Sequence, residues 1–179
     1  FIGIIFAPSK RRVTEREAAE IIAEVRRRRP RPADWVAPRV EATQAPCDHG
    51  NEAGRWLETW SALLRRATQR GGPLTVGVFV DESADEMNRI ADAVGLDLIQ
   101  LHGGEGWELA RALSRPAVRV LHRAPGAGHE EACDGTGAGG TAAGSLGARG
   151  GGTGKTFDWQ VGARVQARAP FMLAGGLTP

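Results

Sequence analysis

Residues 75–103, which read TVGVFVDESADEMNRIADAVGLDLIQLHG, decide the fold. The first part, Thr75–Val80, is apolar on both faces and rich in valine, and the last part, Leu96–Leu101, is also predominantly apolar. Strands of a parallel sheet have this composition because helices cover them. Between the two strands, apolar residues recur at helical spacing. The stretch therefore predicts a strand–helix–strand unit of a parallel α/β fold.

Two helices carry recognisable start signals. Ser83 occupies an N-cap position with Glu86 three residues later, and Thr14 stands in the same relation to Glu17. This spacing is that of a capping box, in which each side chain satisfies a backbone N–H of the other residue. Gly95 predicts the end of the helix that begins after Ser83. The helix after Thr14 is expected to end before the next proline.

Four consecutive arginines, Arg26–Arg29, end the helix that follows Thr14. They predict either a solvated helix end, favoured by the helix dipole, or a nucleic-acid patch. We favour the solvated end because no aromatic residues or second basic cluster accompany them. The net charge of +2 also requires no nucleic-acid or membrane partner. No apolar run reaches the roughly 18 residues that cross a bilayer.

The length of 179 residues predicts one domain, residues 1–179. Two stretches interrupt it: an insertion at about 30–72, with a helix predicted at 52–69, and a glycine-rich, low-complexity loop at about 126–150. Cys47 and Cys133 are too few to predict a disulfide framework, so we expect a cytoplasmic protein. Cys47 and His49 lack a second ligand pair, so we expect no metal there.

Further strands are predicted at Phe1–Ala7, Ala117–His122 and Phe171–Ala174, with helices at 105–113 and 157–168 between them. Strands and helices thus alternate along the chain. The chain opens directly in a strand, without a signal peptide or an initiator methionine, so we expect a fragment or a processed segment.

Polar residues gather where the predicted strands end. Asp81 follows the strand at 75–80, and Gln100 and His102 stand at the end of the next. In parallel α/β sheets that carboxyl edge is where ligands bind.

Glycine-rich turns suggest anion binding in two places. Gly154-Lys155-Thr156 resembles the end of a P-loop, but Arg149 stands where that motif needs glycine. The turn at 150–156, which leads into a predicted helix, can still offer backbone N–H groups to an anion. Gly175-Gly176 after the last strand offers the same. A flexible linker or a tight turn is the alternative at both places, and we favour phosphate.

The stretch Gly150–Trp159, GGGTGKTFDW, resembles the G-G-[ST]-G-K-[ST]-F-D-W signature of the phosphoribosylanthranilate isomerase family. Further stretches resemble that family in the same order; they are Phe6–Arg12, Val76–Val80, Leu98–Gly103 and Leu173–Pro179. The resemblance implies a (β/α)8 TIM barrel that is incomplete here, lacking strands one and eight. The long insertion resembles that of fungal members, in which fusion to other tryptophan-pathway domains is common.

The resemblance implies an intramolecular oxidoreductase of the aldose–ketose type in tryptophan biosynthesis. The family converts N-(5-phosphoribosyl)anthranilate to 1-(2-carboxyphenylamino)-1-deoxyribulose 5-phosphate by an Amadori rearrangement, without metal or organic cofactor. Asp134 matches its general acid. Its general base is a cysteine of strand one, which lies outside this chain. Arg11, Gln100 and His102 match substrate-binding residues, and the phosphate-binding positions are Gly152, Gly154, Lys155, Gly175 and Gly176.

Two alternatives accompany this interpretation. One is a degenerate barrel that binds a sugar phosphate, or only packs on neighbouring domains, without catalysis. The other is a related ribose-phosphate enzyme such as indole-glycerol-phosphate synthase, against which the signature at 150–159 argues. Since strands one and eight are expected to be missing, we expect this piece alone not to isomerise the substrate.

Overall fold

The computed structural model describes residues 1–37, 62–105, 109–110, 112–122, 141–145 and 171–173. In these residues the chain forms a parallel sheet covered by helices. The strands are β1 (Ile2–Ile5), β2 (Thr75–Phe79), β3 (Leu98–Leu101), β4 (Ala117–His122), β5 (Thr141–Ser145) and β6 (Phe171–Leu173). The helices are α1 (Glu15–Arg28) and α3 (Ala84–Val94), and residues 62–71 are also helical.

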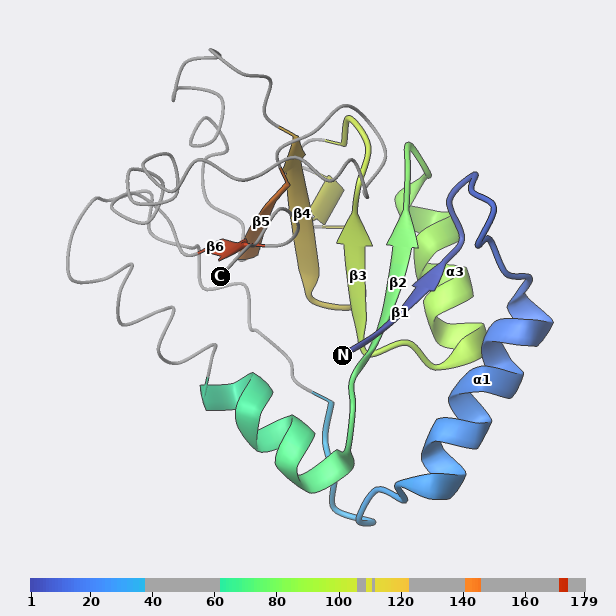
Figure 1. Cartoon of the computed structure of the whole chain (residues 1–179), viewed down its shortest axis with the longest axis vertical. Coiled ribbons are helices and arrows are strands. Elements are labelled where there is room, and N and C mark those ends of the chain that lie inside the picture. The colour runs from blue at the N-terminus through green and yellow to red at the C-terminus, as the bar shows by residue number, and fades with distance from the viewer. Residues whose placement is uncertain (38–61, 106–108, 111, 123–140, 146–170, 174–179) are drawn as a thin grey trace, which may run out of the picture.

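The six strands form one sheet in the order β1-β2-β3-β4-β5-β6, and every neighbouring pair is parallel. Spatial order therefore follows chain order, as in a barrel, whereas doubly wound sheets reverse direction at a switch point. Figure 1 shows α1 and α3 side by side against the sheet, with the carboxyl ends of β2 and β3 pointing the same way. The predicted parallel α/β class is confirmed.

The two helix starts lie where the capping signals predict them. The Thr14 hydroxyl accepts a hydrogen bond from the Glu17 N–H at 3.2 Å, and the Glu17 carboxylate accepts one from the Thr14 N–H at 2.7 Å. Ser83 accepts from the Glu86 N–H at 3.2 Å. Helix α3 ends at Gly95, whose φ of 76° is left-handed and suits a residue without a Cβ.

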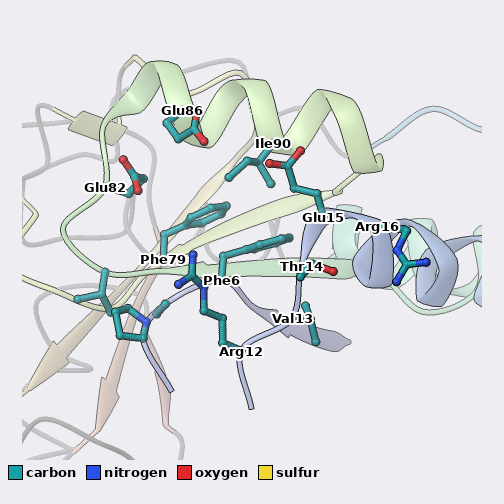
Figure 2. A pocket seen from close by; sticks show the side chains of 13 residues that line it. Phe6, Arg12, Val13, Thr14, Glu15, Arg16, Phe79, Glu82, Glu86 and Ile90 are labelled. Atoms are coloured by element: carbon teal, nitrogen blue, oxygen red, sulfur yellow. The ribbon is translucent and has the colours of Figure 1, made fainter. Parts of the chain in front are cut away.

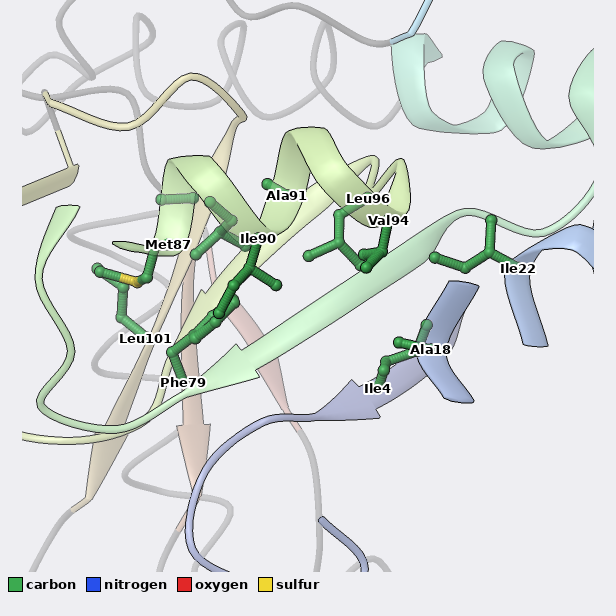
Figure 3. Close-up of a cluster of buried hydrophobic side chains, with 12 residues drawn as sticks. Ile4, Ala18, Ile22, Phe79, Met87, Ile90, Ala91, Val94, Leu96 and Leu101 are labelled. Carbon is green, nitrogen blue, oxygen red and sulfur yellow. The ribbon is translucent and has the colours of Figure 1, made fainter. Parts of the chain in front are cut away.

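The main core lies between the sheet and the two helices (Figure 3). Ile4 of β1 packs with Ala18 and Ile22 of α1. On the neighbouring strands, Phe79 and Leu101 pack with the apolar face of α3, whose buried residues are Met87, Ile90, Ala91 and Val94. This packing holds the carboxyl ends of β2 and β3 in place, because both strands and the helix between them share it.

A second, smaller core lies at the amino ends of the strands. Ala67 of the 62–71 helix packs with Leu74 and Leu98, and Trp35 lies against the same cluster. Figure 1 shows the 62–71 helix below the amino ends of β2 and β3. The described ends of the predicted insertion therefore pack under the sheet, at the edge opposite to the one where polar residues were predicted to gather.

An ion network joins this insertion to the sheet. Asp97, with a side chain only 3% exposed, accepts hydrogen bonds from Arg26 at 2.9 Å and from both terminal nitrogens of Arg31 at 2.8 and 2.7 Å. The Thr75 N–H and hydroxyl also donate to Asp97, at 2.8 and 3.0 Å. Arg31 in turn stacks on the Trp35 ring, 3.4 Å from its centroid.

This network corrects the prediction of a solvated arginine run. Arg27 and Arg28 are solvated as expected, each more than 70% exposed and paired with Glu24. Arg26, the residue before Arg27, points under the sheet, and its side chain is only 21% exposed. The prediction failed at Arg26 because its partner, Asp97, lies 71 residues away in sequence.

The predicted loop at about 126–150 contains a strand. Thr141–Ser145 forms β5 and pairs in register with β4 on one side and β6 on the other. This sequence of small residues has a low β propensity, and pairing of its backbone with both neighbouring strands stabilises it as a strand. The predicted strand at 96–101 begins two residues later, at Leu98. Among the described residues, no helix is long and apolar enough to cross a membrane.

Candidate functional site

The candidate site is the carboxyl edge of the sheet. Because β1, β2 and β3 are mutually parallel neighbours, the residues that follow them emerge at one edge. Arg11 lies in the loop after β1, Asp81 in the loop after β2, and His102 directly after β3. Residues far apart in sequence thus share the edge at which α/β proteins bind ligands.

The loop that carries Arg11 is held by short-range hydrogen bonds. The Ser9 hydroxyl accepts from the Arg11 N–H at 3.1 Å, and the Ser9 carbonyl accepts from the Arg12 N–H at 3.1 Å. The Val13 N–H then donates a hydrogen bond to the Ile5 carbonyl at 3.0 Å. The backbone of Arg11 is therefore fixed in a tight turn, while its side chain is exposed and can reach a ligand.

Gln100 and His102 project from the end of β3. Ile99 and Leu101, which alternate with them, are fully buried in the helix-side core. Since side chains alternate along a strand, Gln100 lies on the face turned away from α1 and α3, in register with Val78 and Val118. His102 follows as a half-buried residue whose N–H donates to the Phe79 carbonyl at 2.9 Å.

These three predicted residues offer complementary chemistry. A guanidinium can bind a carboxylate or phosphate through two hydrogen bonds. The amide of Gln100 can both donate and accept hydrogen bonds, and the imidazole of His102 is also a hydrogen-bonding group. An edge with these groups suits a small, anionic and oxygen-rich ligand.

A separate cleft of about 800 Å³ opens at the same edge on the helix side (Figure 2). Its floor is the stacked pair of Phe6 and Phe79, whose ring centroids lie 5.1 Å apart. Among the described residues its lining includes Arg12 and Glu86 but not Arg11, Gln100 or His102. The cleft is therefore distinct from the predicted substrate-binding residues.

Arg89 pairs with two of the carboxylates that line this cleft. Arg89 donates to Glu15 at 2.6 Å and to Glu86 at 2.7 Å, which lowers the pKa of both carboxyls. Arg12 and Arg16 lie on the same lining. The described lining of the cleft therefore carries charged side chains of both signs.

Sequence reasoning missed one residue at this edge. The sequence predicts Glu105 only as the start of a helix, and its buried carboxylate accepts hydrogen bonds from the backbone of the loops after β2 and β3. Asp81 was noted only as a polar residue at a strand end. The signal in the sequence is Gly103, between His102 and Glu105, because a residue with a Cβ there would prevent the two loops from approaching closely.

Several predicted site residues lie outside the described residues. They are the general-acid candidate Asp134 and the phosphate-binding candidates Gly152, Gly154, Lys155, Gly175 and Gly176. Cys47 and His49 also lie outside them. In the part of the chain that is described, no three metal-ligating side chains come together.

Comparison with known proteins gives one matching family model and several relatives. The sequence model described as N-(5'phosphoribosyl)anthranilate (PRA) isomerase matches residues 58–179. A "Tryptophan biosynthesis protein TRP1" of Phytophthora nicotianae is 37% identical over 99% of this chain and 34% of its own length. An N-(5'-phosphoribosyl)anthranilate isomerase of Dehalococcoides mccartyi is 31% identical over 100% of this chain and 67% of its own length.

A "Multifunctional tryptophan biosynthesis protein" of Phycomyces blakesleeanus is 32% identical, and the match covers 99% of this chain and 24% of that protein. The solved phosphoribosyl anthranilate isomerase of Thermotoga maritima superposes with a TM-score of 0.65 at 23% identity, over 98% of this chain and 65% of that one. At that identity the superposition shows a shared fold. The chain spans about a third of the Phytophthora relative and about a quarter of the Phycomyces relative.

Proposed function

The chain belongs to the N-(5'-phosphoribosyl)anthranilate isomerase family, and from that premise we propose that the whole protein isomerises phosphoribosylanthranilate. The reaction is the Amadori rearrangement to 1-(2-carboxyphenylamino)-1-deoxyribulose 5-phosphate in tryptophan biosynthesis. The observation that carries the proposal is the gathering of Arg11, Gln100 and His102 at one sheet edge in a member of this family. No described observation favours the non-catalytic alternative.

The six strands correspond, in this proposal, to strands two to seven of an eight-stranded barrel. Their sequential parallel order supports the assignment, and so does the 65% coverage of the Thermotoga maritima structure. Closure of a barrel removes the unpaired edges that β1 and β6 present in this sheet. The remaining strands would come from the rest of the whole protein.

The proposed chemistry combines ring opening with the shift of a proton from C2 to C1. An acid protonates the ring oxygen as the furanose opens. We assign that role to Asp134, which precedes β5 in the sequence and would act from the segment between β4 and β5, whereas the family's acid ends strand six. A base then removes the C2 proton of the ring-opened imine to give an enolamine. C1 next gains a proton and the C2 hydroxyl loses one, which gives the aminoketose. The base is assigned to a cysteine outside this chain. Both groups need positions that match the opened sugar, since proton transfer requires hydrogen-bond reach.

Binding is divided between two groups of residues. Arg11, Gln100 and His102 hold the anthranilate and sugar portions. The glycine-rich turns supply backbone N–H groups to the phosphate, a role we assign to Gly152, Gly154, Lys155, Gly175 and Gly176. No cofactor or metal takes part in this scheme.

We also propose that the whole protein is cytoplasmic and fused to other tryptophan-pathway domains. The name of the Phycomyces relative and the small share of it that this chain covers support the fusion. Separation of the expressed whole protein by size, followed by assays of each pathway step on the same peak, tests it.

The test of the activity uses the whole protein and the fluorescence of phosphoribosylanthranilate, which falls as the substrate is consumed. We expect turnover by the wild type and a loss of about 10²–10⁴-fold in kcat in Asp134→Asn, because the ring oxygen loses its acid. A wild type that leaves the fluorescence unchanged would overturn the proposed function. Normal turnover by Asp134→Asn would overturn the acid assignment alone.

Two adjacent arginines provide a matched control. Arg11→Ala should raise KM by about 10-fold or more, since a charge-assisted hydrogen bond to the substrate is lost. Arg12→Ala removes the same charge from the helix-side cleft and should change KM by less than about twofold.

Gly175→Val should raise KM, because the side chain would obstruct the proposed binding of the substrate phosphate. An unchanged KM would count against that site.

A further inference from the structure

Two carboxylates tie together the loops that follow β2 and β3. Glu105 is only 8% exposed. One of its oxygens accepts from the Asp81 N–H at 2.6 Å, and the other accepts from the Gly103 N–H at 2.7 Å. Both oxygens are thus used by backbone groups of two different loops.

Asp81 also binds the loop that carries Glu105. Its Oδ1 accepts from the Gly104 N–H at 2.8 Å. Three short hydrogen bonds therefore join residues 81 and 103–105, which we call the loop clamp. Within the described residues, neither Asp81 nor Glu105 forms an ion pair with an arginine or lysine. Carboxylates that accept only backbone N–H groups fix the path of the main chain, because charge-assisted bonds of this length are strong.

The backbone has adapted to this contact. Asp81 has a φ of 52°, in the left-handed region, which aspartate tolerates better than most residues. A Cβ at Gly103 would lie 2.5 Å from Asp81 Oδ1 and 2.9 Å from Asp81 N, so no larger residue fits. A Cβ at Gly104 would meet Asp81 Oδ1 at 3.5 Å, an ordinary contact. The close approach therefore depends on one glycine of the pair.

The clamp acts next to His102. That residue lies between Leu101, the last residue of β3, and Gly103, whose N–H is bound by Glu105. Its own N–H is bound to the Phe79 carbonyl at 2.9 Å. The main chain of His102 is thus held by the sheet on one side and by Glu105 on the other, which leaves its backbone little freedom.

We propose that Glu105, with Asp81 as its partner, is a positioning residue that sets the His102 side chain for the reaction. This proposal rests on the proposed isomerase function. Glu105 itself would not touch the substrate. A displacement of a substrate-binding group by about 1 Å can cost about 10²-fold in rate. We therefore expect variants that loosen the clamp to lose activity while the protein still folds.

The test compares two disruptive variants with two controls in the whole protein. Glu105→Gln replaces one accepting oxygen by an NH2 group that faces an N–H donor, and Gly103→Ala forces the loops apart. We expect each to lower kcat/KM by about 10–10²-fold, because His102 is a substrate-binding group. Glu82→Gln, an exposed carboxylate whose single accepted bond from the Ser83 N–H an amide oxygen can keep, and Gly104→Ala should remain within about twofold.

The His102 ring provides a readout that does not depend on activity. We expect its imidazole resonances in NMR spectra to shift in Glu105→Gln and to stay at the wild-type positions in Glu82→Gln. An inactive wild type would overturn the proposed function, and the imidazole resonances would then decide the clamp alone. If Gly103→Ala does not fold, Glu105→Gln carries the test. A folded Glu105→Gln protein with unchanged kcat/KM and unchanged imidazole resonances would overturn the proposal.

Discussion

A carboxylate is buried at each of the two edges of the sheet, and the groups that donate hydrogen bonds to it differ between the edges. At the amino edge, Asp97 is met by two guanidinium groups and by Thr75. At the carboxyl edge, Glu105 is met by backbone N–H groups of two loops. The first arrangement neutralises the buried charge and joins distant segments, whereas the second defines the path of two short loops. We infer that the amino edge serves stability and the carboxyl edge serves geometry.

The pKa of Asp97 shows how the amino edge works. Burial alone would raise it, because an ionised carboxylate loses its hydration. Hydrogen bonds from Arg31, from the Thr75 N–H and from Arg26 outweigh that effect, and the pKa of Asp97 lies below its ordinary value. The network is therefore stable as an ionised unit, but each member depends on the others.

The largest effect is expected from Asp97→Ala. This change leaves two part-buried arginines, with side chains 21% and 16% exposed, and the Thr75 N–H without their acceptor. Removing one partner of a buried pair costs about 3–5 kcal/mol in the free energy of unfolding. Urea unfolding of the whole protein measures it. Asp92→Ala, which removes an exposed partner of Arg115, should cost less than about 1 kcal/mol; equal losses would remove the distinction.

A graded form of the same loss should follow acidification. Because the pKa of Asp97 is lower in the folded chain than in the unfolded chain, the unfolded chain binds more protons, so stability falls as pH falls. The loss begins near the unfolded pKa of about 3.9 and continues through the lower folded value. The gap between the urea midpoints of the wild type and Asp97→Asn should therefore stay constant from pH 7 to about pH 5 and narrow between about pH 5 and pH 3. A gap that stays constant over the whole range would show that Asp97 does not titrate with unfolding.

Arg31→Lys should have an intermediate effect. Lysine cannot reproduce the two bonds to Asp97 or the stacking on Trp35. We expect a loss of about 1–3 kcal/mol, with faster hydrogen exchange in the 62–71 helix, which Trp35 joins through a 3.1 Å bond to the Ala67 carbonyl. Arg28→Lys, at an exposed pair with Glu24, is the control. Unchanged exchange in that helix would mean that Arg31 does not dock it.

The smallest effect is expected at the cap of α3. Ser83→Ala removes the acceptor of the Glu86 N–H and should cost about 1 kcal/mol. Thermal unfolding of the whole protein measures it, with Ser114→Ala as a surface control. Because the cap lies beside Asp81, the same variant sharpens the comparison: a kcat that stays near wild type would separate helix stability from the loop clamp. A loss above about 3 kcal/mol in the free energy of unfolding would show that Ser83 stabilises contacts beyond helix α3.

The sequence by itself determined the local features of this protein. The caps at Thr14 and Ser83 and the stop at Gly95 lie where their spacing predicted them, because each depends on residues within one helical turn. The parallel α/β class followed in the same way from valine-rich strands that alternate with amphipathic helices. The carboxyl-edge positions of Arg11, Gln100 and His102 then followed from the parallel direction of the strands.

Only the tertiary structure decided which charges meet. Arg26 and Asp97 are 71 residues apart, and Asp81 and Glu105 are 24 residues apart. No local pattern marks such pairs, because they depend on the register of neighbouring strands and on how closely two loops approach. The strand at 141–145 was missed for the same reason: its pairing with β4 and β6, rather than its own composition, makes it a strand.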